Sequence, residues 1–212
     1  MSDVIREQIV KISKLMYDKG MANAYAGNVS VREGDSIYIT PSGISKGFLA
    51  EDMIVQTDMN GYVIEGMYKP SSEIKLHLAA YRKRSDVRSV IHAHPVYATA
   101  YAVANKPIET MAYAEMIMFF DKIPLAKYGT PSSDEIYQGM EEYIDEYDII
   151  LLANHGVVTV GEDVFDAFFK LEAAEGIAKT LTIAHMIGGE KSLPEEKLKE
   201  LDEIRRRYKN KL

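Results

Sequence analysis

Two pairs of alternating segments near the start of the chain restrict its fold more than any other feature. Apolar and polar side chains alternate on both sides of Glu33-Gly34-Asp35 and again on both sides of Asn60-Gly61; the segments are NVSVR and SIYIT, then IVQTDM and YVIEG. Asn-Gly tolerates positive φ and therefore suits a two-residue hairpin turn. Because hairpin turns join antiparallel strands, the chain must build a sheet that is antiparallel in part.

Helical patterns flank these strands. Ile5, Ile9, Ile12 and Met16 follow one another at steps of four, three and four, which predicts an amphipathic helix over residues 3–19. Similar patterns and cap residues predict helices over residues 70–84, 96–105, 132–147, 163–187 and 194–209.

Two further segments are apolar enough to be buried. Residues 88–94 read RSVIHAH and stop before Pro95, which predicts a strand. Residues 111–120 have no clear period, and we interpret them as a buried strand or loop. The chain has no internal repeat, low-complexity linker or composition break, so residues 1–212 are expected to form one α/β domain with helices packed on a mixed sheet.

Composition excludes several classes of function. The chain has no cysteine, so a metal ion would have to bind nitrogen and oxygen ligands. The net charge is 25 − 32 = −7, and no long Lys/Arg stripe is present, which argues against binding of nucleic acid. The N-terminus carries acidic residues and no apolar run is long enough to cross a membrane, so a cytoplasmic location is expected.

The histidines are the first candidates for chemistry. The chain has five, and His92 and His94 lie two apart in the predicted strand, so both rings project from one face, about 6.6 Å apart at the backbone. That spacing suits two ligands of one metal ion. The alternative is that one ring faces solvent and the other satisfies a hydrogen bond in the core.

Three other positions complete or compete for such a site. His155 ends the apolar run IILLAN before Gly156, where functional residues often gather. Glu73 could supply a carboxylate, although at a helix start it could equally favour the helix dipole. His77, one turn further on, is expected to be a packed or bridging residue, and His185 is expected to be structural.

Small polar and glycine clusters form a second signal. Ala26-Gly27-Asn28, Ser42-Gly43 and Ser71-Ser72 offer amides and hydroxyls without bulk, as phosphate sites require. Each cluster alone is more often a turn or cap. They indicate a site only if the fold brings them together.

These motifs together carry a family resemblance. GNVSVR at 27–32, ITPSGI at 39–44, PSSE at 70–73, VIHAH at 90–94 and NHG at 154–156 resemble, in order and spacing, the class II aldolase/adducin family. The resemblance runs from the first helix to about residue 180, leaving residues 181–212 as a divergent C-terminal helical tail. It implies a three-layer α/β/α domain whose central, largely antiparallel mixed sheet is covered by helices.

The resemblance also implies a site and an activity. It implies one Zn²⁺ per subunit bound by His92, His94, His155 and Glu73, with Glu73 leaving the metal to act as base. The activity implied is reversible cleavage of a phosphorylated ketose, such as L-fuculose 1-phosphate, to dihydroxyacetone phosphate and a small aldehyde. The phosphate of the substrate would lie among Gly27, Asn28, Ser42, Gly43, Ser71 and Ser72.

Two tyrosines are implied as further participants. Tyr113 matches a tyrosine that reaches into the site of a neighbouring subunit, which implies a homotetramer with active sites at subunit interfaces. A buried tyrosine with a satisfied hydroxyl would look the same in sequence. Tyr208 could match a tyrosine of the family's mobile C-terminal tail.

Related activities stay open at this point. An L-ribulose 5-phosphate 4-epimerase would be expected to carry aspartate at position 73, so Glu73 favours an aldolase, whereas phosphosugar dehydratases also carry glutamate. An adducin-like scaffold would need no metal. All four ligand positions are occupied by ligand residues in this chain, which favours an enzyme.

Overall fold

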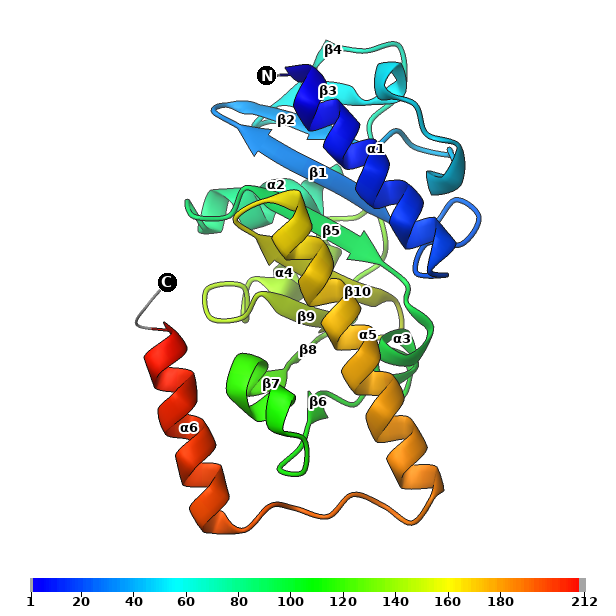
Figure 1. Ribbon diagram of the computed structural model, residues 1–212. Coiled ribbons are helices and arrows are strands. Elements are labelled where there is room, and N and C mark those ends of the chain that lie inside the picture. The colour runs from blue at the N-terminus through cyan, green and yellow to red at the C-terminus, as the bar shows by residue number, and fades with distance from the viewer. Residues whose placement is uncertain (1, 210–212) are drawn as a thin grey trace.

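A single eight-stranded sheet forms the middle of the protein (Figure 1), in the order β4-β3-β2-β1-β5-β10-β9-β8. The computed structural model describes residues 2–209 and the side chains of residues 2–207. Every strand pair of this sheet is antiparallel except β8 with β9. The strands are β1 (Asn28–Glu33), β2 (Ser36–Ile39), β3 (Val55–Asp58), β4 (Val63–Glu65), β5 (Ser89–Ala93), β8 (Leu125–Ala126), β9 (Ile149–Leu152) and β10 (Gly156–Gly161), with β6 (Ile108–Glu109) and β7 (Lys122–Ile123) paired separately.

Helices cover both faces of the sheet, so the predicted three-layer α/β/α fold is confirmed. Side chains alternate along each strand, and Val157 joins the apolar core under one helical layer while Val158 joins the core under the other. The first layer holds α1 (Ser2–Asp18), α3 (Val96–Val103) and α5 (Val164–Met186); the second holds α2 (Ile74–Lys83) and α4 (Glu135–Met140).

The C-terminal helix lies apart from these layers. Helix α6 (Glu195–Lys209; Figure 1) contacts the short π-helix η3 (Met116–Phe120). Arg205 of α6 forms an ion pair of 2.6 Å with Asp121. Two 3₁₀ turns, η1 (Lys46–Phe48) and η2 (Glu51–Met53), connect β2 to β3. Within residues 2–209 no helix is long and apolar enough to span a membrane.

The predicted two-residue turn at Asn60-Gly61 is wrong by one residue. The Asp58 amide donates to the Tyr62 carbonyl at 2.9 Å and the Gly61 amide donates to the Asp58 carbonyl at 3.0 Å, so the loop contains three residues. The Asp58 carboxylate also accepts hydrogen bonds from the Asn60 and Tyr62 amides, which stabilises the longer loop. Gly61 still supplies the positive φ, at 85°.

Two predictions of secondary structure need correction. Residues 111–120 end in the helical segment η3 rather than in a strand or loop, closed by a bond of 2.8 Å from the Asp121 amide to the Met116 carbonyl. A π-turn spreads its apolar side chains around the helix, which explains the missing period. The helix expected over 132–147 is regular only in α4, and turns follow it.

Candidate active site

Three histidine rings converge at one end of the central strands. His92 is in β5, His94 directly follows it, and His155 lies in the turn between β9 and β10. Strands β5 and β10 are neighbours, with Val157 opposite Ala93, so the turn lies beside the end of β5. The possible ligand atoms of the three rings all lie within 4.8 Å of one another.

The backbone of the turn between β9 and β10 leaves space for these rings. The His155 amide donates to the Leu152 carbonyl at 3.0 Å, and Asn154 adopts a positive φ of 56°, a conformation that asparagine tolerates. A Cβ atom on Gly156 would lie 2.4 Å from Cδ2 of His94 and 2.6 Å from the Ala93 carbonyl oxygen. Only glycine therefore fits between the turn and the His94 ring.

Glu73 brings a carboxylate to the same point from the start of α2. Its Oε2 lies 3.5 Å from Nε2 of His92, and its Oε1 lies 3.5 Å from Nε2 of His155. Asn28, the first residue of β1, donates from Nδ2 to Oε2 at 2.8 Å. The helix begins only at Ile74, so Glu73 is free to turn its side chain toward the sheet.

The four residues fit a divalent metal ion. Glu73 Oε1 is buried without a hydrogen-bond partner among the described residues, as expected of an atom that awaits a ligand. His92 Nδ1 lies 3.0 Å from the Val157 carbonyl oxygen; donation to that oxygen leaves the Nε2 lone pair for a metal. Three imidazoles and a carboxylate form a donor set that zinc accepts.

The surroundings keep the rings in the form that binds metals. Burial lowers the pKa of His92 well below its usual value, and the charges of His94 and His155 lower it further. Burial is also the main cause of the lowered pKa values of His94 and His155. The three rings are therefore neutral at pH 7, with lone pairs available.

The predicted anion-binding residues divide into two groups. Gly27 and Asn28 lead into β1 beside the histidines, and a Cβ atom on Gly27 would meet the His92 carbonyl oxygen at 3.1 Å. Ser71 is buried, and its hydroxyl accepts a hydrogen bond of 3.3 Å from the Glu73 amide, while Ser72 is exposed. These residues thus adjoin the metal-ligand cluster.

Ser42 and Gly43 are brought to the same region by backbone pairing. The Ser42 amide donates to the Lys69 carbonyl at 2.9 Å, and Pro41 and Pro70 form a β-bridge. Both residues are exposed, and Gly43 has a φ of 72°. The two serine-containing loops therefore run side by side, although their role in binding a phosphate stays a prediction.

Sequence reasoning missed a buried lysine beside this region. Lys46 is 1% exposed, and its Nζ donates to the Ile44 carbonyl oxygen at 2.9 Å. Burial lowers the pKa of Lys46 to about 8, and the charge of Glu73 partly opposes that shift. A short 3₁₀ turn has no side-chain period, so only the proximity of Lys46 to the Ser42-Gly43 pair could have identified it.

His77 and His185 lie outside the ligand cluster. His77 is fully buried and bridges Asn28 to Ser30, in agreement with the expectation of a packed or bridging residue. The His185 side chain is 55% exposed and lies 3.6 Å from the Glu190 carboxylate. Among the described residues, neither ring belongs to the group of three histidines that could hold a metal ion.

The structure does not bring Tyr113 to the histidines of its own chain. Tyr113 lines a cavity of about 900 Å³ between η3, the start of β9 and α5, together with Phe119, Tyr147 and Phe169. In the part of the chain that the structure describes, none of the site histidines lines that cavity. Tyr208 is in the last turn of α6, but its side chain is outside the described residues.

The fold and the four converging residues are those of a candidate metal-dependent enzyme, and the comparisons identify its family. Residues 7–182 match the family model described as Class II Aldolase and Adducin N-terminal domain, so the chain belongs to the class II aldolase and adducin family.

Individual relatives are named as aldolases. An L-fuculose phosphate aldolase of Methanocaldococcus jannaschii is 41% identical over 182 residues, which cover 86% of this chain and 97% of the relative. A 5-deoxy-D-ribulose 1-phosphate aldolase of Bacillus thuringiensis serovar kurstaki is 32% identical over 92% of both chains. A solved structure of an L-fuculose 1-phosphate aldolase superposes with a TM-score of 0.88 at 30% identity, covering 99% of this chain and 98% of the other.

Proposed function

We propose that the protein is a zinc-dependent class II aldolase that reversibly cleaves a phosphorylated ketose, of the L-fuculose 1-phosphate type, to dihydroxyacetone phosphate and a small aldehyde. The observation that carries the proposal is the convergence of His92, His94, His155 and Glu73. The relatives named above support this class of substrate: their names give L-fuculose phosphate, 5-deoxy-D-ribulose 1-phosphate and, for the solved structure, L-fuculose 1-phosphate.

The chemistry requires a stabilised negative charge. Cleavage of the carbon–carbon bond leaves an enediolate, and a divalent cation at His92, His94 and His155 would supply positive charge where that enediolate develops. No lysine Schiff base is then needed.

Glu73 is proposed as the base that moves a proton at the reacting carbon of dihydroxyacetone phosphate. Its Oε2 is fixed by Asn28, and its Oε1 has no hydrogen-bond partner among the described residues. In condensation the carboxylate removes this proton and the new hydroxyl receives one from a second acid; cleavage reverses both transfers. Tyr113 of a neighbouring subunit is proposed as that second acid.

The phosphate is proposed to bind where the serine-containing loops meet the start of β1. Backbone amides, hydroxyls and the nearby Lys46 ammonium group suit a dianion there. The residues proposed to bind it are Gly27, Asn28, Ser42, Gly43, Ser71 and Ser72.

Several features of the whole protein belong to the same proposal. We propose a homotetramer with active sites between subunits, which accords with the position of Tyr113 away from the histidines of its own chain. We also propose that the chain forms one domain with a helical tail over residues 181–212. The role of Tyr208 and the cytoplasmic location are further parts of this proposal.

A substrate panel tests the reaction. Protein loaded with Zn²⁺ is incubated with dihydroxyacetone phosphate and lactaldehyde, glycolaldehyde or acetaldehyde, and separately with L-ribulose 5-phosphate. We expect new ketose 1-phosphates in the first set and no epimer in the second, with Glu73→Gln as the inactive control. Epimerisation of L-ribulose 5-phosphate without condensation would identify an epimerase, and a protein that binds no metal and forms no product would indicate a scaffold.

A further inference from the structure

A buried chain of hydrogen bonds lies directly behind Glu73. Asn28 donates to Glu73 Oε2 at 2.8 Å, and the Asn28 amide oxygen lies 2.5 Å from His77 Nε2. His77 Nδ1 lies 2.7 Å from the Ser30 hydroxyl, which lies 2.6 Å from the Tyr81 hydroxyl. Five side chains are therefore linked in series from the core to the candidate metal ligand.

Strand and helix geometry place these side chains in line. Asn28 and Ser30 are two apart in β1 and share one face, whereas His77 and Tyr81 are four apart in α2 and share one helix face. Glu73 directly precedes α2, four residues before His77. The chain is withdrawn from solvent, because His77 and Ser30 are 0% exposed. Each donor in it must therefore be satisfied by the protein.

The donor and acceptor of every hydrogen bond in this series follow from the Glu73 carboxylate at one end of the series. An ionised Glu73 only accepts, so the Asn28 amide must present Nδ2 to it and Oδ1 to His77. His77 Nε2 must then carry a proton, and its Nδ1 must accept the proton of the Ser30 hydroxyl. The Ser30 oxygen in turn accepts from the Tyr81 hydroxyl.

We propose that His77 is a positioning residue, held as the neutral Nε2–H tautomer, which orients the Asn28 amide and so leaves Oε1 as the reactive oxygen of Glu73. The Asn28 hydrogen bond occupies Oε2, whereas Oε1 is buried without a hydrogen-bond partner among the described residues. A rotated Asn28 amide would place its oxygen against the carboxylate and expel it from this position.

The surroundings of His77 agree with a neutral ring. The pKa of His77 is lowered to about 3, mainly by burial and further by the charge of His92, while the charge of Glu73 partly opposes the shift. Tyr81, the remaining titratable group in the chain, has its pKa raised by burial and is a neutral donor at pH 7. A protonated His77 would leave the Ser30 hydroxyl proton without its acceptor.

Nuclear magnetic resonance of the ¹⁵N-histidine-labelled full-length protein tests the tautomer without any assay of activity. Two-bond ¹H–¹⁵N correlations distinguish Nε2–H from Nδ1–H rings, and the His77 signals are assigned by their loss in His77→Gln. We expect an Nε2–H ring from pH 5.5 to pH 8.5, both without metal and with Zn²⁺. An Nδ1–H tautomer, or protonation of this ring within that range, would overturn the proposal.

Matched variants test the positioning role, which rests on the proposed function. Gln at position 77 can donate from an amide nitrogen placed like Nε2, whereas Phe retains the ring volume but donates nothing. We expect His77→Phe to slow proton exchange on dihydroxyacetone phosphate by about tenfold or more at nearly unchanged KM, and His77→Gln to restore most of the rate. His185→Gln is the control for an exposed histidine.

The remaining outcomes separate positioning from packing. Equal losses in His77→Phe and His77→Gln, with folding and metal content intact, would mean that the ring only fills space and would overturn the proposal. If His77→Phe does not fold, Ser30→Ala removes the donor to Nδ1, and we expect a mixture of His77 tautomers and a slower exchange. If the wild-type protein catalyses no exchange, the aldolase assignment fails while the tautomer measurement still decides this inference.

Discussion

The buried carboxylate oxygen Oε1 of Glu73 is unfavourable for folding unless a ligand satisfies it. A buried polar atom without a hydrogen-bond partner costs about 1–3 kcal/mol, and Glu73 Oε1 is such an atom in the described structure. A bound metal ion would remove much of this cost because it binds the folded state far better than the unfolded chain. The residues that permit chemistry are thus also residues that couple metal binding to stability.

Alanine at His92, His94 or His155 is expected to abolish metal binding and activity together. Each substitution removes one donor from a set whose atoms lie within 4.8 Å. Metal analysis of the purified variants, with thermal unfolding with and without Zn²⁺, measures both effects; the wild-type protein should gain stability from the ion and these three variants should not. His185→Ala should behave as wild type, and stoichiometric zinc retained in a variant of the cluster would contradict that residue's assignment.

The buried Lys46 side chain is predicted to lower the free energy of unfolding of the protein. Burial lowers the pKa of Lys46 to about 8 from a usual value near 10.4, so the unfolded chain binds more protons between these pH values and stability rises with pH there. At pH 7 the folded protein therefore carries the full cost of a buried charge. Lys46→Met should raise the free energy of unfolding at pH 7 by about 1–3 kcal/mol.

Urea denaturation at pH 7 and at pH 10.5 measures this effect. The gain from Lys46→Met should shrink at the higher pH, where the lysine is neutral in the folded protein. The exposed Lys14→Met serves as the control and should change stability little. A Lys46→Met protein that is less stable than wild type at pH 7 would show that the ammonium group makes a net favourable interaction in the fold.

Local spacing explains which site residues could be predicted from sequence. The two-residue spacing of His92 and His94 indicated a shared strand face, and the four-residue spacing of Glu73 and His77 indicated a shared helix face. Both follow from backbone geometry alone. The roles of Ser30 and Lys46 depend on which strand and loop lie beside α2, which no local period encodes.

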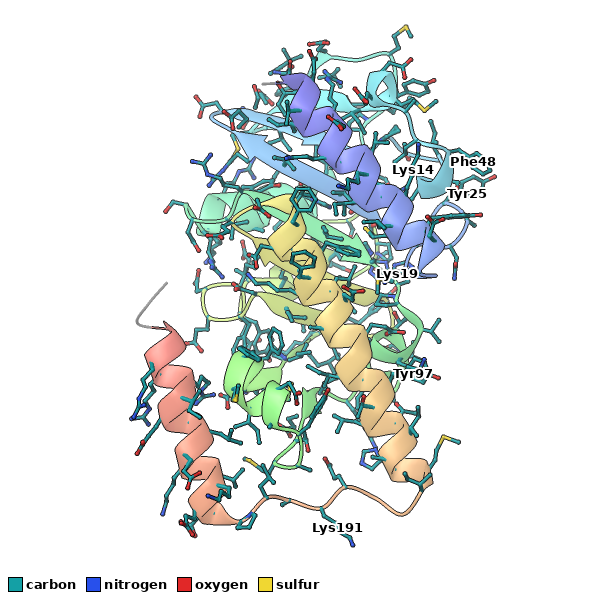
Figure 2. All side chains as sticks on the ribbon, in the orientation of Figure 1. Lys14, Lys19, Tyr25, Phe48, Tyr97 and Lys191 are labelled. Atoms are coloured by element: carbon teal, nitrogen blue, oxygen red, sulfur yellow. The ribbon has the colours of Figure 1, made fainter. Side chains whose placement is uncertain are left out.

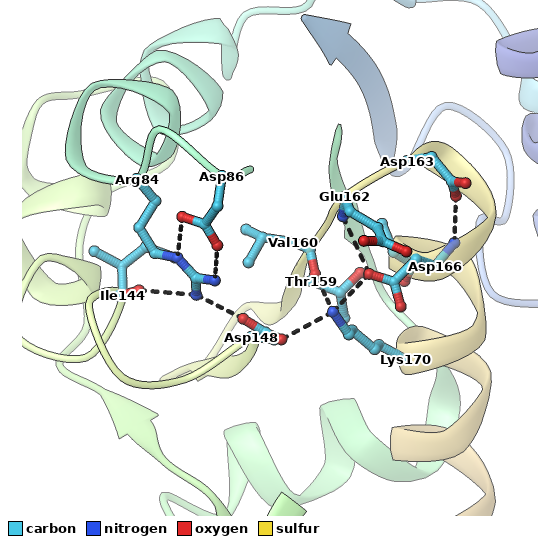
Figure 3. A network of polar contacts seen from close by, with 11 residues as sticks. Arg84, Asp86, Ile144, Asp148, Thr159, Val160, Glu162, Asp163, Asp166 and Lys170 are labelled. Carbon is cyan, nitrogen blue, oxygen red and sulfur yellow. Dashed lines mark hydrogen bonds and ion pairs between the residues drawn. The ribbon is translucent and has the colours of Figure 1, made fainter. Parts of the chain in front are cut away.

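At the scale of secondary-structure elements, a charged cluster links the end of α2, the start of β9, β10 and α5 (Figure 3). Arg84 forms ion pairs of 2.5 Å with Asp86 and 2.6 Å with Asp148. Lys170 of α5 pairs with Asp148 at 2.8 Å and with Asp166 at 2.7 Å. Asp148 therefore connects the end of α2 to α5.

Asp148→Asn is expected to destabilise the protein at neutral pH and to have little effect in acid. Burial raises the pKa of Asp148, but the charge of Lys170 and hydrogen bonds from Lys170 and Arg84 outweigh it, so the pKa lies below its usual value. The stabilisation is present above about pH 4 and is lost as the pH falls through the lowered folded pKa. Because the carboxylate is 36% exposed, solvent screening limits the loss at pH 7 to about 1–2 kcal/mol.

Chemical denaturation at pH 7 and pH 3 measures that difference. Glu200→Gln is the control, because its pair with Lys197 is on the exposed surface of α6 and should contribute little. If Asp148→Asn lowers the free energy of unfolding equally at both pH values, its effect comes from packing rather than from the loss of a charge.

The elements themselves were predictable where they followed a single period. The helices α1 and α5 and strands β1 and β5 were predicted from such patterns and are confirmed. The loop at Asn60-Gly61 is longer than predicted because the Asp58 side chain stabilises a three-residue turn. The helical segment η3 was not predicted because the side chains of a π-turn do not follow the spacing of an α-helix. Side-chain hydrogen bonds and rare helical geometry thus set the limit of the prediction.

At the scale of the whole molecule, one region is suited to contact between copies of the chain. Tyr25 and Phe48 are 72% and 75% exposed, and both extend from the segments near the end of α1 (Figure 2). The loop of Tyr25 also contacts the site, because the Met21 carbonyl accepts a hydrogen bond of 3.0 Å from the His94 amide. Exposed aromatic side chains in this region suit the subunit contact that the proposed oligomer requires.

Subunit mixing tests whether that neighbour supplies Tyr113. Tyr113→Phe and Glu73→Gln should each be nearly inactive alone, yet a mixed oligomer places an intact Glu73 from one chain beside an intact Tyr113 from another. With random 1:1 mixing after reversible dissociation, about a quarter of the sites should regain both groups, and cleavage activity should rise accordingly.

A second mixture makes this result specific to Tyr113. Glu73 and His92 come from the same chain in every site, so Glu73→Gln mixed with His92→Ala should regain nothing, even though the oligomers exchange subunits equally well. Native mass spectrometry shows whether mixed oligomers form in both cases. If they form and Tyr113→Phe with Glu73→Gln also regains nothing, the cavity that Tyr113 lines is not part of a neighbouring active site, and the acid for the aldehyde half must come from the chain that binds the metal.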